Sequence, residues 1–127
     1  MRTIMLVGIG GFCGAALRYI VSGKVQQICG STLLPYGTLA VNGLGSFVLG
    51  IIFWLGIERG LFGPSFRAFA SIGLLGGFTT FSTFSVETVN LLSVGARWAA
   101  LANVLANVAV CLAAVIAARW IVVAVWD

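Results

Sequence analysis

The sequence predicts an all-α membrane protein: four transmembrane helices form a single integral membrane domain over residues 1–127, and the third helix is broken near its centre. Of the 127 residues, 61% are hydrophobic and 8% are charged, whereas about a quarter of the residues in soluble domains are charged. Uncharged intervals near or above the roughly 20 residues needed to cross a bilayer separate the charges: 15 residues between Arg2 and Arg18, 33 between Lys24 and Glu58, 19 between Arg67 and Glu87, and 21 between Arg97 and Arg119. The third interval also contains glycines and hydroxyl residues that disfavour a continuous helix.

The first two spans are predicted over residues 3–23 and 36–57. Arg2 before an apolar run resembles the start of a signal peptide. However, the run has no clear small-residue cleavage site and three more apolar spans follow it, so we interpret it as a retained helix. Gly10 and Gly14 have the four-residue spacing that lets helix backbones approach closely in lipid. The second span follows Pro35, and a turn-rich connector separates it from the third span.

The third span, residues 68–92, is a poor continuous helix. Gly76 and Gly77 weaken it, and the threonines and serines that follow compete for backbone hydrogen-bond partners. We expect the helix to break at residues 76–79. Irregular backbone survives in hydrocarbon only where it is buried in protein or lines a water-filled cavity, so this segment is the predicted functional centre. The fourth span, residues 98–121, carries Asn103 and Asn107 one helical turn apart.

The basic residues are distributed almost evenly between the two membrane sides. The predicted spans place Arg2, Arg59, Arg67 and Arg119 on the side of both termini, and Arg18, Lys24 and Arg97 on the other. Because lysine and arginine asymmetry sets orientation, a four-to-three split gives little instruction for insertion. We therefore predict insertion in both orientations and an antiparallel dual-topology homodimer, with a paralogous partner as the alternative.

Composition excludes several function classes. The chain has no histidine and three acids, Glu58, Glu87 and Asp127. Paired-carboxylate catalysis, a histidine base and a His/Cys zinc site therefore lack their components, and we predict that the protein is not an enzyme. The basic residues are scattered singly, so membrane lipid rather than nucleic acid is the expected surrounding partner.

The three cysteines, Cys13, Cys29 and Cys111, are an odd set without the CxxC spacing of a redox or metal site. Two of them lie inside apolar runs. We interpret them as small buried hydrophobic residues rather than as ligands or a disulfide.

The predicted break offers a cation site. A broken helix frees backbone carbonyls that can bind a cation, as in membrane transporters whose discontinuous helices hold ions. A hard monovalent cation such as sodium is plausible because residues 76–79 contain no carboxylate. The alternative is a tightly packed glycine crossing without an ion.

The tripeptide Thr-Phe-Ser occurs twice in succession, at residues 80–82 and 83–85. Residues three apart share a helix face, so the repeat predicts adjacent threonine, phenylalanine and serine stripes. Phenylalanine rings have positive edges and hydroxyls donate without a fixed charge, so this wall suits a small anion. The alternative is that Phe81 and Phe84 pack against core or lipid while the hydroxyls bond back to the preceding helical turn.

Other polar residues within the spans also need partners. Asn42 either donates to an anion or ties two helices together, and Thr38 shares its helix face. Arg18 either snorkels to the interface or lines an aqueous mouth, and Glu87 either pairs with a basic residue or lines a vestibule.

Three segments together make the chain similar to a known family. GGFTTFSTFSVE at residues 76–87, GTLAVN at 37–42 and GAALRY at 14–19 resemble the CrcB/Fluc family of fluoride channels. The resemblance covers essentially the whole chain. It implies a dual-topology antiparallel dimer in a bacterial inner membrane, which passes cytoplasmic fluoride outward down its electrochemical gradient. It also implies a structural sodium ion that is not transported, held at the dimer centre by the backbone carbonyls of Gly76 and Thr79 from both subunits.

The resemblance further implies roles for residues along the pathway. It assigns Phe81 and Phe84 as pore phenylalanines, Asn42 as a donor to fluoride, Ser82 and Thr83 as hydroxyls on the path, Thr38 and Asn107 as further polar groups along it, and Arg18 and Glu87 as vestibule residues. One departure concerns the fourth span, where members of the family tend to have a serine at the position of Cys111. A thiol is a weak donor, so Asn107 is expected to take a larger share there.

Two other function classes remain as alternatives. A small multidrug exporter also has four spans and dual topology, but it needs a carboxylate in the first span, which contains no acid here. A non-transporting membrane assembly subunit would use the same asparagines and glycines as packing devices and would show no ion flux.

Overall fold

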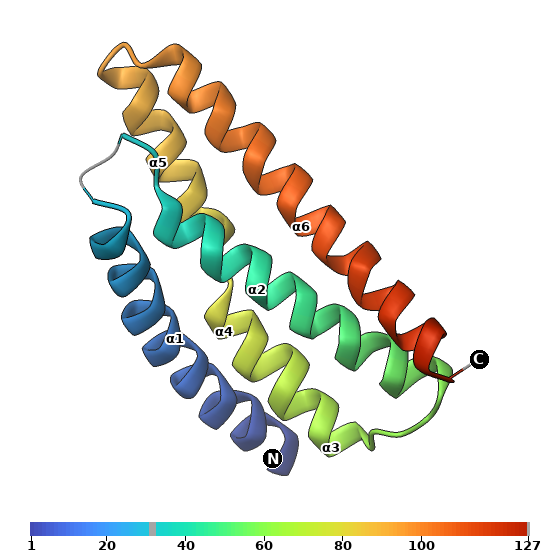
Figure 1. The fold of residues 1–127 in the computed structure, drawn as a ribbon. Helices are drawn as coiled ribbons and strands as arrows, with labels where there is room; N and C mark the ends of the chain where they lie inside the picture. The colour runs from blue at the N-terminus through green and yellow to red at the C-terminus, as the bar shows by residue number, and fades with distance from the viewer. Residues whose placement is uncertain (31–32, 127) are drawn as a thin grey trace.

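The protein consists of long apolar helices that pack alongside one another (Figure 1). The computed structural model describes residues 1–30 and 33–126, without the side chains of residues 57 and 58. Two of the three acids in the sequence, Glu58 and Asp127, therefore lie outside the described side chains. Within this part of the chain the regular structure is entirely helical. Four helices are long and apolar enough to cross a membrane: Arg2–Ile28, Tyr36–Gly56, Pro64–Ser93 and Arg97–Trp126. The predicted all-α class with four spans is confirmed.

The helices begin and end at residues suited to those positions. The elements are α1 (Arg2–Ile28), α2 (Tyr36–Phe53) with a π-helical continuation η1 (Trp54–Glu58), a third span made of α3 (Pro64–Arg67), π-helical η2 (Ala68–Leu75), α4 (Gly76–Phe78) and α5 (Phe81–Ser93), and finally α6 (Arg97–Trp126). Pro64 is the first residue of α3, where its missing N–H costs nothing. Shortly after α1 and α5 end, Gly30 and Gly95 adopt φ values of 76° and 78°, which glycine tolerates best.

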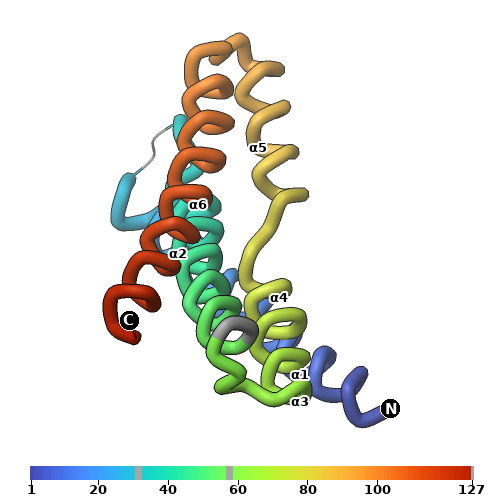
Figure 2. Tube along the Cα trace, turned by 90° about the vertical axis from the view of Figure 1, so that its right-hand side faces the viewer, coloured from blue at the N-terminus to red at the C-terminus, as the bar shows by residue number. Residues whose placement is uncertain are grey.

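The third span is broken between α4 and α5, where Figure 2 shows a stretch without helical coil. Thr79 and Thr80 are extended, with ψ values of 158° and 115°. The predicted break is therefore present, but it lies at Thr79 and Thr80, and the expectation of a break beginning at Gly76 is wrong. Gly76 and Gly77 stay helical because Gly77 packs directly on the α1 backbone.

The N-terminal half of the third span crosses α1 at glycines on both helices. An added Cβ at Gly10 would lie 2.8 Å from Leu74 N, and one at Gly14 would overlap the Leu74 carbonyl oxygen. On the facing span, Gly73 and Gly77 would each place a Cβ 2.7 Å from an α1 backbone oxygen. The close helix approach predicted from the Gly10 and Gly14 spacing is confirmed.

Gly14→Ala is expected to destabilise the protein, because the new methyl group meets backbone that cannot rotate away. Overpacking of this kind costs about 1–3 kcal/mol. Gly23→Ala is the matched control on the same helix, since nothing lies within 4 Å of its Cβ position. It should gain up to about 1 kcal/mol from helix propensity. Thermal unfolding in detergent measures both, and equal melting temperatures for the two variants would contradict the close crossing.

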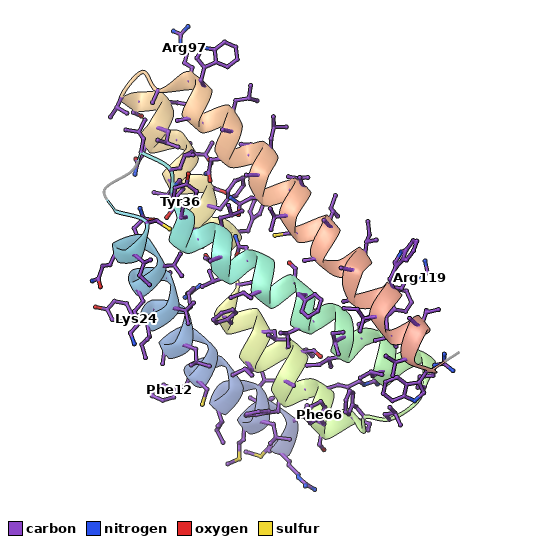
Figure 3. The ribbon with its side chains drawn as sticks, in the orientation of Figure 1. Phe12, Lys24, Tyr36, Phe66, Arg97 and Arg119 are labelled. Atoms are coloured by element: carbon purple, nitrogen blue, oxygen red, sulfur yellow. The ribbon has the colours of Figure 1, made fainter. Side chains whose placement is uncertain are left out.

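Both chain termini lie at one end of the helix bundle, and the loops after α1 and α5 lie at the other (Figures 1 and 2). Arg18 is ten residues from the end of α1, about 15 Å along the axis, and it contacts the break rather than the membrane boundary. Arg18 therefore lies inside the first span and not at the membrane boundary, where the tally of basic residues had placed it. Without Arg18, the basic residues divide four to two, with Arg2, Arg59, Arg67 and Arg119 at the terminal end and Lys24 and Arg97 at the other. Figure 3 shows Lys24 and Arg97 towards the end opposite Arg119. An excess of two basic residues still gives only a weak instruction for orientation.

Candidate functional site

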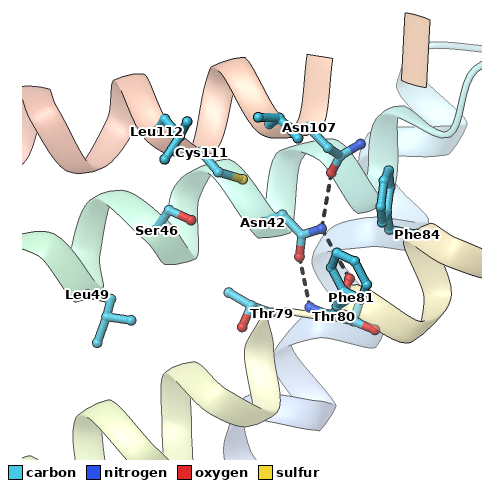
Figure 4. Close-up of a pocket in the computed structure, with 11 residues that line it drawn as sticks. Asn42, Ser46, Leu49, Thr79, Thr80, Phe81, Phe84, Asn107, Cys111 and Leu112 are labelled. Atoms are coloured by element: carbon cyan, nitrogen blue, oxygen red, sulfur yellow. Dashed lines mark hydrogen bonds between the residues drawn. The ribbon is translucent and has the colours of Figure 1, made fainter. Parts of the chain in front are cut away.

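A single side chain of α2 holds the break in the third span. Asn42 Oδ1 accepts a hydrogen bond from Thr80 N at 2.8 Å, and Asn42 Nδ2 donates to Thr80 O and to Asn107 Oδ1, each at 3.1 Å (Figure 4). Because a backbone N–H can only donate, the Thr80 N–H determines which end of the amide faces it. Of the two roles considered for Asn42, the tie between helices is present, and both amide protons are engaged.

The hydrogen bonds continue from Asn107 through a second amide to α5. Asn107 Nδ2 donates to Asn103 Oδ1 at 3.0 Å, Asn103 Nδ2 donates to Thr88 Oγ1 at 2.9 Å, and Thr88 Oγ1 donates to Phe84 O at 2.8 Å. Asn103 and Asn107 are both buried. Buried amides in hydrocarbon need such partners, and these two asparagines find them in one another, in Asn42 and in Thr88.

A pocket of about 370 Å³ lies between α2, α5 and α6 beside this network (Figure 4). Its lining is mostly apolar with a few polar groups, as is typical of ligand sites: Asn42, Ser46, Leu49, Thr79, Thr80, Phe81, Phe84, Asn107, Val108, Cys111 and Leu112. The Phe81 and Phe84 rings lie 5.3 Å apart at an angle of 54°, so the predicted phenylalanine stripe is confirmed. Phe84 is buried at 8% exposure, whereas Phe81 is 79% exposed within the single chain.

The hydroxyl groups of the repeat divide between two arrangements. Thr80 Oγ1 donates to Thr83 Oγ1 at 2.9 Å and lies 3.3 Å from Ser82 Oγ, which places these three hydroxyls together at the start of α5. Ser85 Oγ instead bonds back to Phe81 O at 2.9 Å, as the alternative interpretation expected. Since Thr83 Oγ1 receives the Thr80 proton and donates to no described residue, its own proton is available to a ligand.

A second polar space lies on the α1 side of the break. A cavity of about 210 Å³ is lined by Ala15, Arg18, Tyr19, Ser22, Thr38, Val41, Thr80 and Thr83. An adjoining cavity of about 360 Å³ shares Ser22, Thr38 and Thr83 and continues past Glu87 to Pro35, near the membrane boundary. Thr80 lines both the smaller cavity and the pocket described above, so the break stands between the two spaces.

The charged residues of this space face the cavity rather than each other. Arg18 Nη1 lies 3.4 Å from Thr79 O, and Thr38 Oγ1 donates to Glu87 Oε1 at 2.7 Å. Glu87 Oε2 is buried and has no partner among the described residues. Of the alternatives considered, Arg18 and Glu87 therefore line cavities, and Glu87 is bound by a hydroxyl.

Two carbonyl groups at the break are suited to a cation. The Thr80 N–H, which would continue the helix to Gly76 O, donates to Asn42 instead. Thr79 is already extended, so its carbonyl lies beyond the helix end. Gly76 is exposed and Thr79 is half-buried, so neither is fully covered by the rest of the single chain.

Sequence analysis assigned no role to Asn103, Thr88 or Ser22. The spacing of Asn103 and Asn107 was a usable signal, but Thr88 is one of several hydroxyl residues in the third span and its partner is known only from the fold. The interpretation of the cysteines as buried was wrong. Cys13 and Cys111 are half-buried in this single chain, Cys29 is exposed, and all three are free thiols.

The fold and the site together define a small multi-pass membrane protein with a buried polar crossing point at the middle of its third span. A family model described as "CrcB-like protein, Camphor Resistance (CrcB)" matches residues 5–119. The chain belongs to this CrcB family, which confirms the resemblance found in the sequence.

Several bacterial relatives carry the name "Fluoride-specific ion channel FluC". The relative from Shewanella pealeana is 48% identical over 112 residues, covering 88% of this chain and 89% of its own. The relative from Geotalea daltonii is 46% identical, covering 88% and 90%, and that from Geobacter sulfurreducens is 44% identical over 123 residues, covering 94% and 98%. The family is one of ion channels, so the prediction that this protein is not an enzyme is confirmed.

Proposed function

We propose that the protein is a fluoride-selective channel that exports cytoplasmic fluoride passively. The observation that carries this proposal is the buried polar break beside Phe81 and Phe84, in a chain whose relatives are named as fluoride-specific channels. The polar crossing offers ring edges, amides and hydroxyls to a small anion, without an acid in the pocket.

Passive export has a simple physical basis. Fluoride enters cells as neutral HF, which dissociates at cytoplasmic pH and leaves the anion trapped. An inside-negative membrane potential drives an anion outward with about 2.3 kcal/mol per 100 mV. A selective pore is therefore sufficient, and neither ATP nor proton coupling is needed.

In this proposal the ion passes from the α1-side cavities to the pocket through the break. The Arg18 guanidinium and the free Thr83 proton attract fluoride to the inner cavity, with Thr38 and Glu87 towards its mouth. Phe81 and Phe84 then present ring edges, with Asn107 as a polar side chain in the same pocket and the Ser82 hydroxyl 3.3 Å from that of Thr80 at the start of α5. Asn42 acts chiefly by holding the break, since donation to fluoride requires one of its two amide hydrogen bonds to open.

We also propose that a structural sodium ion, not transported, is held by the carbonyls of Gly76 and Thr79. Both carbonyls lack the helical donor they would have in a continuous helix, which fits an oxygen-liganded hard cation. The Arg18 contact to Thr79 O is long at 3.4 Å, and a carbonyl oxygen has a second lone pair. Bound there, sodium would balance the partial charges of these carbonyls and join two copies of the chain.

The working unit is proposed to be an antiparallel, dual-topology homodimer in the bacterial inner membrane, or a heterodimer with a paralogue. Irregular backbone at mid-membrane must be buried in protein or line a water-filled cavity, and the residues that flank the break, Gly76, Phe81 and Ser82, are exposed in the single chain. A second copy placed over this face would cover the break. It would also complete the wall on the exposed side of Phe81.

Fluoride efflux from liposomes tests the proposal. Liposomes loaded with potassium fluoride and containing the purified chain alone should release fluoride to an ion-selective electrode on addition of valinomycin, while chloride-loaded liposomes retain chloride. Folded protein that releases no fluoride would reject the channel. Because Cys29 is an exposed free thiol at the opposite end, the topology test uses a variant with the three native cysteines replaced by serine. Labelling of a C-terminal cysteine tag on this variant in intact cells should reach about half the chains. Labelling of all or none would reject dual topology and leave a heteromeric partner.

A further inference from the structure

The hydrogen bonds around the break form a continuous circuit that starts at Thr80 and ends on the third span at the Phe84 carbonyl. The circuit runs from Thr80 of the break to Asn42 of α2, to Asn107 and Asn103 of α6, and through Thr88 back to the Phe84 carbonyl of α5. Each link is between 2.8 and 3.1 Å long. It leaves the third span at Thr80, before Phe84, crosses α2 and α6, and returns to the third span at Thr88, after Phe84.

The direction of every proton in this circuit is set from one end. The Thr80 N–H requires the Asn42 oxygen, so the Asn42 amide nitrogen faces Asn107. The Asn107 oxygen then receives that proton, and its nitrogen donates to Asn103, whose nitrogen is left to donate to Thr88. Only one orientation of each amide satisfies all of its hydrogen-bond partners. The circuit is therefore a single cooperative unit rather than a set of separate contacts.

We propose that Asn103 and Thr88 are a positioning pair for the Phe84 ring of the fluoride pathway. Their hydrogen bond, 2.9 Å long, joins α6 to the half of α5 that carries Phe84. Asn103 is 3% exposed, so the bond is shielded from water and lipid. Thr88 is one helical turn beyond Phe84 and is bonded to its carbonyl, so the cross-helix bond fixes the backbone that aims the ring. Neither side chain lines the pocket.

Thr88→Val tests the pair, because valine keeps the side-chain shape and removes the hydroxyl, while Thr88→Ser keeps the hydroxyl as a matched control. We expect Thr88→Val to lower fluoride efflux per folded channel by roughly tenfold, equivalent to about 1.4 kcal/mol, and to raise chloride leakage; Thr88→Ser should behave like the wild type. Asn103→Leu should cause a loss at least as large, because it also removes the bond from Asn107, and the double variant should lose less than the sum of the two single losses, because both substitutions remove the bond between the pair.

The inference rests on the proposed function for its flux readout, so a second readout is independent of flux. With 4-fluorophenylalanine at position 84, the ¹⁹F resonance should shift or broaden in Thr88→Val and stay unchanged in Thr88→Ser. A silent wild type rejects the proposed channel and leaves the spectroscopic test standing. A conducting wild type whose Thr88→Val variant keeps both the resonance and the flux, or whose two single losses add in the double variant, overturns the positioning pair.

Discussion

Asn42→Ala is expected to abolish fluoride efflux and to cause the largest loss of stability among single side-chain truncations near the break. The substitution leaves the Thr80 N–H and C=O without the partners that Asn42 supplies. An unpaired backbone group in hydrocarbon costs several kcal/mol. The break would then have to close into helix or take up water, and either change would move the carbonyls and the rings beside it.

Asn107→Ala is the comparison that separates the break from the amide network. This variant removes the side-chain bond to Asn42 and that to Asn103 but leaves both Thr80 contacts in place. Side-chain hydrogen bonds between membrane helices average about 0.6 kcal/mol, so its cost should be well below that of Asn42→Ala. Both the melting temperature in detergent and the efflux rate per folded channel should be lower for Asn42→Ala than for Asn107→Ala.

A reversed order would show that the network, and not the tie to the break, determines stability. Wild-type efflux from Asn42→Ala would contradict both roles considered for Asn42, the tie and the donor. An Asn42→Ala variant that has lost efflux but melts at the wild-type temperature would support a role on the pathway that goes beyond holding the break.

Much of this site was predictable because local chemistry dictated it. The uncharged intervals predicted the four helices, and the three-residue repeat predicted that Phe81 and Phe84 share a face. The spacing of Gly10 and Gly14 predicted the close crossing, since a missing side chain is a local property. The polar side chain of Asn42 required a hydrogen-bond partner within the membrane, but the sequence did not indicate which residue supplies it.

The remaining features depend on contacts between distant segments. The break lies at Thr79 and Thr80 because Asn42, from another helix, accepts the Thr80 N–H. The helical state of Gly76 and Gly77 likewise follows from packing of Gly77 against α1. Arg18 lies deeper in the first span than the sequence predicted, because α1 continues to Ile28 and no residue between them ends the helix. Propensity and spacing alone carry no information on these tertiary contacts.

Phe81→Ile is expected to reduce fluoride efflux by up to about tenfold while leaving the amount of folded protein unchanged. Isoleucine keeps most of the apolar surface but has no ring edge to present to an anion. Aromatic pairs, whose edge-to-face form uses the same positive ring edge, are worth about 0.5–1.5 kcal/mol each, and 1.4 kcal/mol corresponds to a tenfold rate change. Because Phe81 is 79% exposed in the single chain, its replacement opens no cavity within the fold of one copy. The initial rate of fluoride release per folded channel measures the effect.

Phe12→Ile is the matched control, because it makes the same exchange at a side chain of nearly equal exposure, 77%, on α1 and outside the pocket. Efflux should be unchanged in this variant if the ring at position 81 acts on the ion. Equal losses in both variants would mean that the exchange acts through packing against lipid or a second copy. If Phe81→Ile lowers efflux and also separates the dimer while Phe12→Ile does neither, Phe81 is an interface residue first, and Phe84 carries the ring-edge role alone.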